Sequence, residues 1–167
     1  LVRALELKEE NGGSVSIITV GDSHDEAIMR KALAIGADEA IRVDTEPKDA
    51  YSVAMQISDY AKKNHFDMIL TGKETINYNG SQVGGMIAED MDLPFISLAS
   101  KLEANGNILK IESEDLGGIQ VIEVNTPVVI SCAKGMAEQR IPNMRGIMAA
   151  RTKPLNVVPA TDVEPLT

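Results

Sequence analysis

Short apolar runs alternate with amphipathic segments along the first part of the chain, up to residue 98. The run at 15–20 is β-branched and mostly apolar, which is typical of a strand buried on both faces of a parallel sheet. The segment 47–63 instead places Val53, Ile57 and Ala61 four positions apart, which indicates an amphipathic helix. By the same criteria we expect strands at 15–20, 39–43, 66–71, 95–98 and 128–132, and helices at 1–10, 24–35, 47–63 and 80–91.

This alternation of strand and helix predicts right-handed βαβ crossovers, and therefore an α/β fold built on a parallel sheet. In the helix at 24–35 we expect Ile28, Ala32 and Ile35 to face the core. Because ligands bind at the carboxyl ends of the strands in such sheets, the loops that follow the strands are the places to search for a site.

The pattern changes after residue 100. Alternating segments at 102–112 and 120–124 flank a glycine-rich turn at 115–118, which predicts a β-hairpin or a longer β-meander. The last part, 143–167, has one short helical stretch followed by three prolines. We therefore expect the chain to end in an extended C-terminal tail.

The composition restricts the class of protein. The chain has 167 residues, a formal net charge of −9, and proportions of hydrophobic and charged residues typical of a globular domain. Nucleic-acid binding is a poor expectation, because it needs a basic footprint. Cys132 is the single cysteine, so no internal disulfide can form, and its apolar neighbours favour a buried structural thiol over a nucleophile. No apolar stretch approaches the length of a membrane span, and we expect a reducing compartment such as the bacterial cytoplasm.

One polar loop, at 72–80, follows a buried strand and leads into a helix. The unpaired N–H groups of a helix N-terminus suit a phosphate, and Gly80, Gly84 and Gly85 leave room for the close approach of a ligand or a strand. The residues alone fit two interpretations, a nucleotide-binding loop or a polar loop whose glycines serve helix–sheet packing. The first strand also ends before a helix, so its tip could converge on the same ligand.

Other nucleotide-binding and catalytic motifs are missing from the sequence. Gly72-Lys73 is followed by Glu74, where a P-loop needs Ser or Thr. No GxGxxG follows the first strand, and no GxSxG elbow occurs. His24 and His65 have no obvious ligand set beside them, and no pair of carboxylates suggests acid–base chemistry. We therefore predict neither a catalytic site nor a metal site.

A second informative segment, at 133–154, carries five basic residues and one acid, a formal charge of +4, which leaves −13 on the rest of the chain. At its centre, the sequence RIPNMRGIM places apolar residues between arginines. Exposed apolar side chains framed by charge suit protein docking, whereas the alternative is that they pack a short helix onto the sheet. We favour packing for Ile147 and Met148, and leave both interpretations open for Met144.

These two segments, together with ALAIGAD at 32–38, resemble the β subunit of electron-transfer flavoproteins. The resemblance covers roughly residues 1–158, with 159–167 as a tail. It implies a Rossmann-like α/β domain of the adenine-nucleotide α-hydrolase type, paired with an α subunit that carries most of the FAD site. It also implies an electron carrier without turnover of its own, which holds a structural AMP and passes electrons from acyl-CoA dehydrogenases toward the respiratory chain, as in fatty-acid oxidation.

The resemblance also assigns roles to individual residues. Met144 would be the apolar anchor that docks partner dehydrogenases, with Arg140 and Arg145 beside it, and Glu114 would hold the mobile flavin domain. The nucleotide would be bound at the tip of the first strand and by the whole polar loop, with its phosphate at the start of the following helix. The implied nucleotide contacts are Val20, Gly72, Lys73, Glu74, Thr75, Ile76, Asn77, Tyr78, Asn79, Gly80, Ser81, Gln82 and Val83.

Some positions depart from the family pattern. Asn77 stands where Asp is common, and Val83 stands where many AMP-binding members have Thr, which leaves open a second FAD as in electron-bifurcating members. An alternative outside the family is a stand-alone ATP-binding module of the stress-protein kind. Family members also begin with a further strand and a nucleotide-contacting loop, so we expect the native chain to be longer at its N-terminus.

Overall fold

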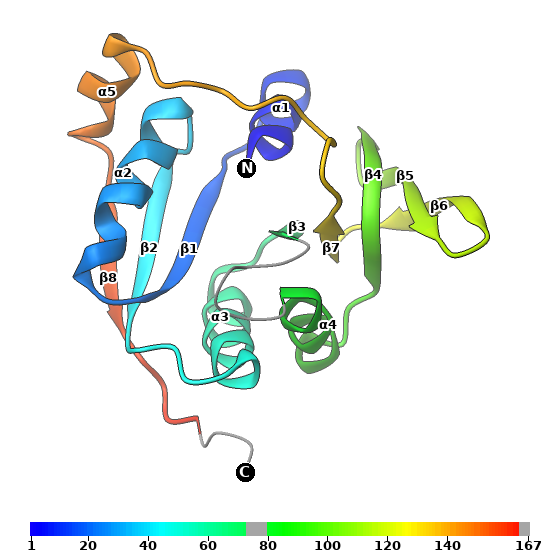
Figure 1. Cartoon of the computed structure of the whole chain (residues 1–167), viewed down its shortest axis with the longest axis horizontal. Helices are drawn as coiled ribbons and strands as arrows, with labels where there is room; N and C mark the ends of the chain where they lie inside the picture. The colour runs from blue at the N-terminus through cyan, green and yellow to red at the C-terminus, as the bar shows by residue number, and fades with distance from the viewer. Residues whose placement is uncertain (73–79, 164–167) are drawn as a thin grey trace. The chain divides into compact units, whose positions relative to one another are not determined.

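The computed structural model describes residues 1–72 and 80–163, and these fall into two compact units. Unit 1 comprises Leu1–Pro47 and Glu138–Asp162, so two distant parts of the chain fold together. Unit 2 comprises Lys48–Ala137, with Val163. In Figure 1 the blue strand near the N-terminus and the red strand near the C-terminus belong to one sheet.

Unit 1 is a three-stranded parallel sheet with helices. It contains α1 (Val2–Asn11), β1 (Ser16–Gly21), a 3-10 turn (Ser23–Asp25), α2 (Glu26–Ile35), β2 (Glu39–Asp44), α5 (Met144–Ala150) and β8 (Leu155–Pro159). The strand order is β1-β2-β8, with Val20 opposite Val43 and Ala40 opposite Leu155. Side chains from all three helices and the sheet form one core, whose buried members are Leu5, Val15, Met29, Leu33, Ala37, Ala40 and Ala150.

The C-terminal segment differs from the expected extended tail. Residues Leu155–Pro159 form β8, which pairs in parallel with β2 over its whole length. Pro154 and Pro159 bracket this strand, and proline is tolerated there because β8 lies at an edge of the sheet. The pairing partner lies more than a hundred residues earlier in the chain, so local sequence did not indicate it.

The buried face of α2 also differs from the prediction. The fully buried residues are Met29 and Leu33, whereas Ile28 is 68% exposed. Each residue turns a helix by about 100°, so Ile28, one position before Met29, points to the surface. Ala32 is half-buried, and Ile35 packs against the core as predicted.

Unit 2 is a five-stranded mixed sheet with two helices. It contains α3 (Ala50–Asn64), β3 (Met68–Gly72), α4 (Gly80–Met91), β4 (Phe95–Asn105), β5 (Ile108–Asp115), β6 (Gly118–Asn125) and β7 (Val128–Cys132). The strand order is β3-β7-β4-β5-β6, with β3, β7 and β4 parallel and the last two pairs antiparallel. Both helices contribute to a core cluster of Ala54, Ile87, Ala88 and Val129. The α/β class with a parallel sheet is thereby confirmed.

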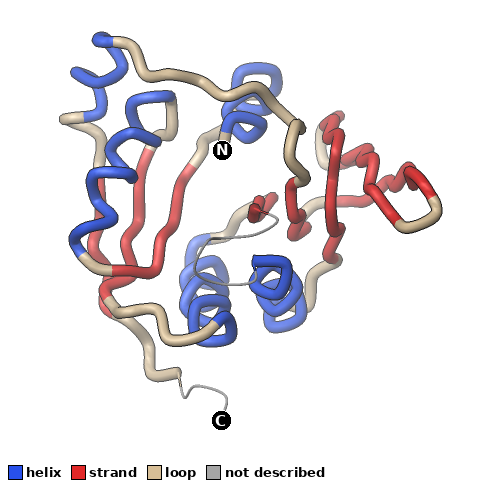
Figure 2. Tube along the Cα trace, viewed as in Figure 1, coloured by secondary structure: helices blue, strands red, loops and turns tan. Residues whose placement is uncertain are grey.

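The predicted β-meander is confirmed, and the structure adds a turn within it. The long strand β4 continues through the predicted 95–98 strand to Asn105, and a turn at Gly106, with φ +62°, leads into β5. Strands β4, β5 and β6 then run as consecutive antiparallel neighbours, drawn as red tubes in Figure 2. Asn-Gly at 105–106 is a strong hairpin signal, since both residues tolerate a positive φ.

Candidate functional site

The carboxyl end of β3 meets the first turns of α4 in unit 2. A Cβ placed on Gly84 would lie 2.9 Å from Thr71 Oγ1 and 2.9 Å from a ring carbon of Phe95, so glycine is required for α4 to pack this closely. Gly85 also lies against Phe95. For these two glycines the structure therefore supports helix–sheet packing, the second interpretation of the sequence.

One polar atom at this strand end has no partner. Thr71 Oγ1 is buried and accepts or donates no hydrogen bond within the described part of the chain. A buried hydroxyl without a partner is costly unless another group satisfies it. A polar ligand at the carboxyl end of β3 fits this unsatisfied hydroxyl.

The predicted loop residues divide into three groups. Gly72 ends β3 and is exposed, Gln82 is exposed on α4, and Val83 is half-buried against the core of unit 2. Gly80 and Ser81 lie in the first turn of α4, and the structure does not describe their side chains. The remaining predicted contacts lie outside the described residues: Lys73, Glu74, Thr75, Ile76, Asn77, Tyr78 and Asn79.

The start of α4 can bind an anion. The first four N–H groups of a helix have no acceptor within it, and the helix dipole places partial positive charge there. Gln82 can add a side-chain donor, whereas Val83 contributes only its backbone N–H because its side chain has no polar atom. The described residues therefore fit a phosphate group at this helix start.

The tip of β1 in unit 1 has a different character. Val20 is half-buried in the β1–β2 ladder, and the helical turn after it is capped by Asp22. The Asp22 carboxylate accepts hydrogen bonds from the His24 backbone N–H at 2.9 Å and from the His24 ring at 3.0 Å. The hydrogen bond from the His24 backbone holds the pKa of Asp22 below its usual value. Since a carboxylate already caps this helix start, an added anion would be repelled.

The sequence analysis missed a buried arginine beside this tip. Arg42 is 6% exposed and lies within the buried run of β2. Its guanidinium donates to Asp44 Oδ1 at 2.7 Å, to Glu26 Oε1 at 3.1 Å and to the Gly21 carbonyl at 3.1 Å. The signal was a single cation between the apolar residues Ile41 and Val43. A cation can be buried at such a position only when hydrogen-bond acceptors surround it.

The basic segment in unit 1 exposes apolar side chains. Ile141 is 86% exposed and Met144 is 74% exposed, while Ile147 and Met148 are 41% and 54% exposed. Arg145 is also exposed. Ile141 was not singled out from the sequence, although its position between Arg140 and Pro142 could have indicated it. The packing interpretation favoured for Ile147 and Met148 is therefore wrong: both side chains are exposed, and neither belongs to the core of the unit.

Helix α5, which follows these residues, is held tightly on α2. A Cβ on Gly146 would overlap the backbone carbonyl oxygen of Ala34, so the two helices touch at this glycine. Side chains also cap the C-terminal ends of both helices. Arg30 of α2 donates to the carbonyls of Ala150 and Lys153 at 2.9 and 2.8 Å, and Lys153 Nζ donates to the carbonyls of Leu33 and Ala37, both at 2.8 Å.

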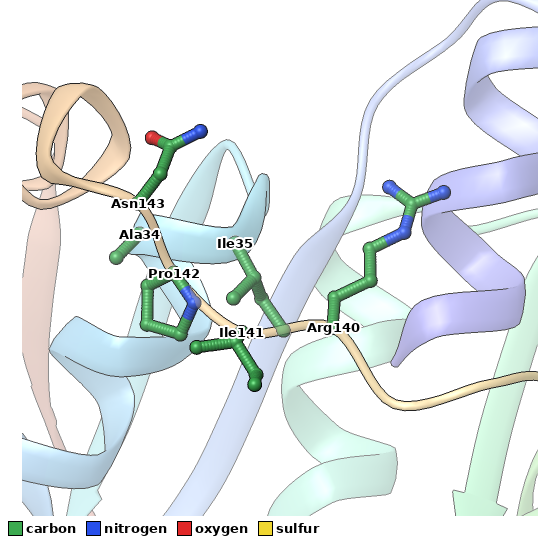
Figure 3. Close-up of a pocket in the computed structure, with 6 residues that line it drawn as sticks. All are labelled: Ala34, Ile35, Arg140, Ile141, Pro142 and Asn143. Atoms are coloured by element: carbon green, nitrogen blue, oxygen red, sulfur yellow. The ribbon is translucent and has the colours of Figure 1, made fainter.

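Arg140 is paired within the unit. Its guanidinium donates to both carboxylate oxygens of Glu9 on α1, at 2.7 and 3.0 Å. Figure 3 shows its side chain leaving the loop toward α1. A pocket of about 330 Å³ is lined by Ala34, Ile35 and residues 140–143. Asn143 Oδ1 accepts from the Gly146 N–H and so caps α5.

Glu114 is exposed on β5, opposite Ile119 of β6. Burial raises the pKa of the Cys132 thiol, which favours its protonated form and a structural role. Among the described residues, no group of three His, Cys, Asp or Glu is arranged to hold a metal, and no helix is long and apolar enough to cross a membrane.

Comparison with known proteins finds similar chains among subunits named for electron transfer. It is 34% identical to the electron transfer flavoprotein subunit beta of Bacillus subtilis, covering 96% of this chain and 64% of the relative. It is 36% identical to the corresponding subunit of Syntrophomonas wolfei, covering 96% and 65%. It is 31% identical to the acryloyl-CoA reductase electron transfer subunit gamma of Anaerotignum propionicum, covering 93% and 61%.

The chain thus spans less than two thirds of the length of these relatives. The sequence model of the family described as "Electron transfer flavoprotein domain" matches residues 1–163, nearly the whole chain. The chain therefore belongs to the electron transfer flavoprotein family.

Proposed function

We propose that this chain is the nucleotide-binding part of the β subunit of a heterodimeric electron-transfer flavoprotein. In this role it is an electron carrier without turnover of its own, and it shares the redox FAD with an α subunit. The observation that carries the proposal is the match of residues 1–163 to the family, combined with exposed apolar side chains in the segment around the start of α5. The supporting geometry lies in two places, the start of α4 and the segment before α5.

The nucleotide proposed for this subunit is AMP, a structural ligand. Its phosphate would lie at the start of α4, where unpaired N–H groups and Gln82 supply donors. The unsatisfied hydroxyl of Thr71 at the neighbouring strand end supports a polar ligand there. The contacts of the nucleotide with Val20 and with residues 72–81 remain predictions. That these residues bind the same ligand is also a prediction.

Weighing the ligand released by denaturation tests this assignment. The full-length protein is purified with its flavin-bearing partner, unfolded, and the released nucleotides are identified by mass spectrometry. We expect one AMP for each β subunit. A second FAD in place of AMP would contradict a structural nucleotide and favour the electron-bifurcating type. The observation behind this alternative is Val83, which lacks the hydroxyl of the Thr found there in many AMP-binding members.

Purification also tests the alternative outside the family. A stand-alone ATP-binding module would behave as a homodimer that binds ATP without a flavoprotein partner. Isolation of the native protein with a second, FAD-bearing subunit excludes that alternative. Isolation as a homodimer that binds ATP and carries no flavin would instead contradict the proposed function.

The proposed donors are acyl-CoA dehydrogenases or related CoA-ester enzymes. The Anaerotignum relative is named for an acryloyl-CoA reductase, which supports CoA-linked chemistry in the family. The proposed docking surface is the segment from Arg140 to Arg145. Ile141 and Met144, both largely exposed, would provide its apolar contacts, since a few exposed apolar side chains carry most of the energy of an interface.

Truncation of these two side chains should weaken docking. Ile141→Ala and Met144→Ala should each raise the KM for the flavoprotein in a dehydrogenase assay by about tenfold, equivalent to about 1.4 kcal/mol of binding energy. The bound nucleotide should stay at the wild-type content. Ile108→Ala is a matched control, because Ile108 is 53% exposed on β5 and lies outside the segment. An unchanged KM in both variants would show that these side chains do not dock the donor.

A further inference from the structure

The loop that carries Ile141 is poorly supported by packing. Residues 138–143 form neither helix nor strand, and most of them are exposed. Residues 140–143 line an open pocket of about 330 Å³ together with Ala34 and Ile35 of α2 (Figure 3). Exposed side chains in a surface loop make few packing contacts, so packing alone constrains the position of the loop only weakly. Its position must depend on specific polar contacts.

Two such contacts lie on either side of Ile141. After it, the Asn143 side chain caps α5 through the Gly146 N–H at 2.8 Å. Before it, Arg140 bonds Glu9 of α1 at 2.7 and 3.0 Å, across 131 positions of sequence. The loop is therefore tied at both ends, and the exposed Ile141 lies between the two ties.

The Arg140–Glu9 contact fixes direction as well as distance. Two parallel N–H···O bonds hold a planar guanidinium against a planar carboxylate, which defines the orientation of both groups. The hydrogen bond from Arg140 also holds the pKa of Glu9 below its usual value. Because Glu9 is exposed, its ion pair with Arg140 adds little to the free energy of unfolding. The main effect of the pair should therefore be on where the loop lies.

We propose that Glu9 is a positioning residue for docking: it holds Arg140 so that the loop presents Ile141 to the partner dehydrogenase. This inference rests on the proposed function. Glu9 itself does not contact the partner, and Arg140 acts within the subunit as the link between α1 and the loop. The sequence assigned Arg140 to docking beside Met144, and the structure gives it an intramolecular partner.

The test uses the full-length protein with its flavin-bearing partner and an acyl-CoA dehydrogenase from the same organism. Glu9→Gln should raise the KM for the flavoprotein about threefold to tenfold and leave kcat unchanged. The variant loses binding energy that is equal in the ground state and the transition state, so the rate of the bound complex does not change. Glu10→Gln is the matched control: Glu10 is the next residue of α1, loses the same charge, and contacts Arg3 rather than Arg140. It should leave both constants unchanged.

Charge reversal separates positioning from direct contact. Glu9→Arg and Arg140→Glu should each raise the KM, and the double variant should recover it, since the pair is restored with its direction reversed. If the double variant stays impaired, or if Glu9→Gln behaves as Glu10→Gln does, the positioning role is wrong. Should Ile141→Ala and Met144→Ala also leave the KM unchanged, the docking surface itself would be wrong rather than only the role of Glu9.

Discussion

At the scale of single residues, the charged groups of unit 1 act as links between elements. Asp38, just before β2, accepts from Lys8 Nζ of α1 at 2.7 Å and from the Val15 N–H at 2.8 Å. Burial raises the pKa of Asp38, but these two hydrogen bonds outweigh it and the net pKa lies below the usual value. The ionised carboxylate therefore stabilises the folded state more than the unfolded state.

Asp38→Asn should destabilise the protein in a pH-dependent way. A carboxyl whose pKa is lowered by folding stabilises the protein above its unfolded pKa, and this contribution is lost as the pH falls through the folded pKa. We expect a loss of about 1 kcal/mol at pH 7, because the group is partly exposed and screened, and a smaller loss below about pH 4. Urea unfolding of both proteins at several pH values measures it.

Asp67→Asn is the control for that experiment. Asp67 is exposed before β3, and its side chain makes no hydrogen bond or ion pair in the described part of the chain. Its substitution should change the free energy of unfolding by less than about 0.5 kcal/mol. An equal difference between wild type and Asp38→Asn at pH 7 and at pH 3 would contradict the electrostatic account.

At the scale of elements, the contact between α2 and α5 sets the base of the docking segment. Alanine is normally favoured over glycine inside a helix by about 1 kcal/mol. At Gly146 the added methyl would overlap the Ala34 carbonyl, so α5 would have to move. We expect Gly146→Ala to destabilise the protein by about 1–3 kcal/mol, as overpacking does.

The informative result is whether Gly146→Ala lowers or raises the stability of the protein. Thermal unfolding of the full-length protein measures it, and Gly117→Ala serves as control. Gly117 has no atom within 4 Å of an added Cβ and needs no positive φ. A gain in stability from Gly146→Ala would show that α5 can shift without cost.

Other elements show where the local sequence pattern is enough to predict the structure and where it is not. The strands β1, β2 and β7 and the helix α4 end within two residues of their predicted bounds, because their apolar runs and glycine breaks are local signals. The predicted burial of β1 on both faces is wrong, since β1 lies at an edge of its sheet and is mostly half-buried. Strand β8 was missed because its pairing with β2 is a long-range contact. The face of α2 was misplaced because Ile28 and Met29 are equally apolar, and only packing selects Met29.

At the scale of the whole molecule, charge is unevenly distributed along the chain. The segment 133–154 has a formal charge of +4 and the rest −13. Opposite charges on two partners accelerate their encounter, and salt screens that attraction. If the basic segment faces the donor, encounter should depend on the ionic strength.

Electron transfer from the dehydrogenase should therefore slow as salt increases. We expect kcat/KM to fall about threefold or more between about 50 and 200 mM salt. Arg145→Gln should lower kcat/KM at low salt and flatten the salt dependence, because it removes an exposed charge from the segment. Lys110→Gln, which removes an exposed charge from β5, should do neither. An identical salt dependence in all three proteins would place the electrostatic attraction elsewhere.

The sequence by itself determined the α/β class, most of the helices and strands, the family, and the segment that combines arginines with apolar residues. These follow from local periodicity, turn residues and short motifs, which do not depend on distant contacts. Only the tertiary structure decided that Arg140 pairs with Glu9, that Ile141 is the most exposed apolar residue of its loop, and that Gly146 rests on Ala34. Exposure and pairing depend on residues that are brought together from opposite ends of the chain, and one linear pattern does not contain that information.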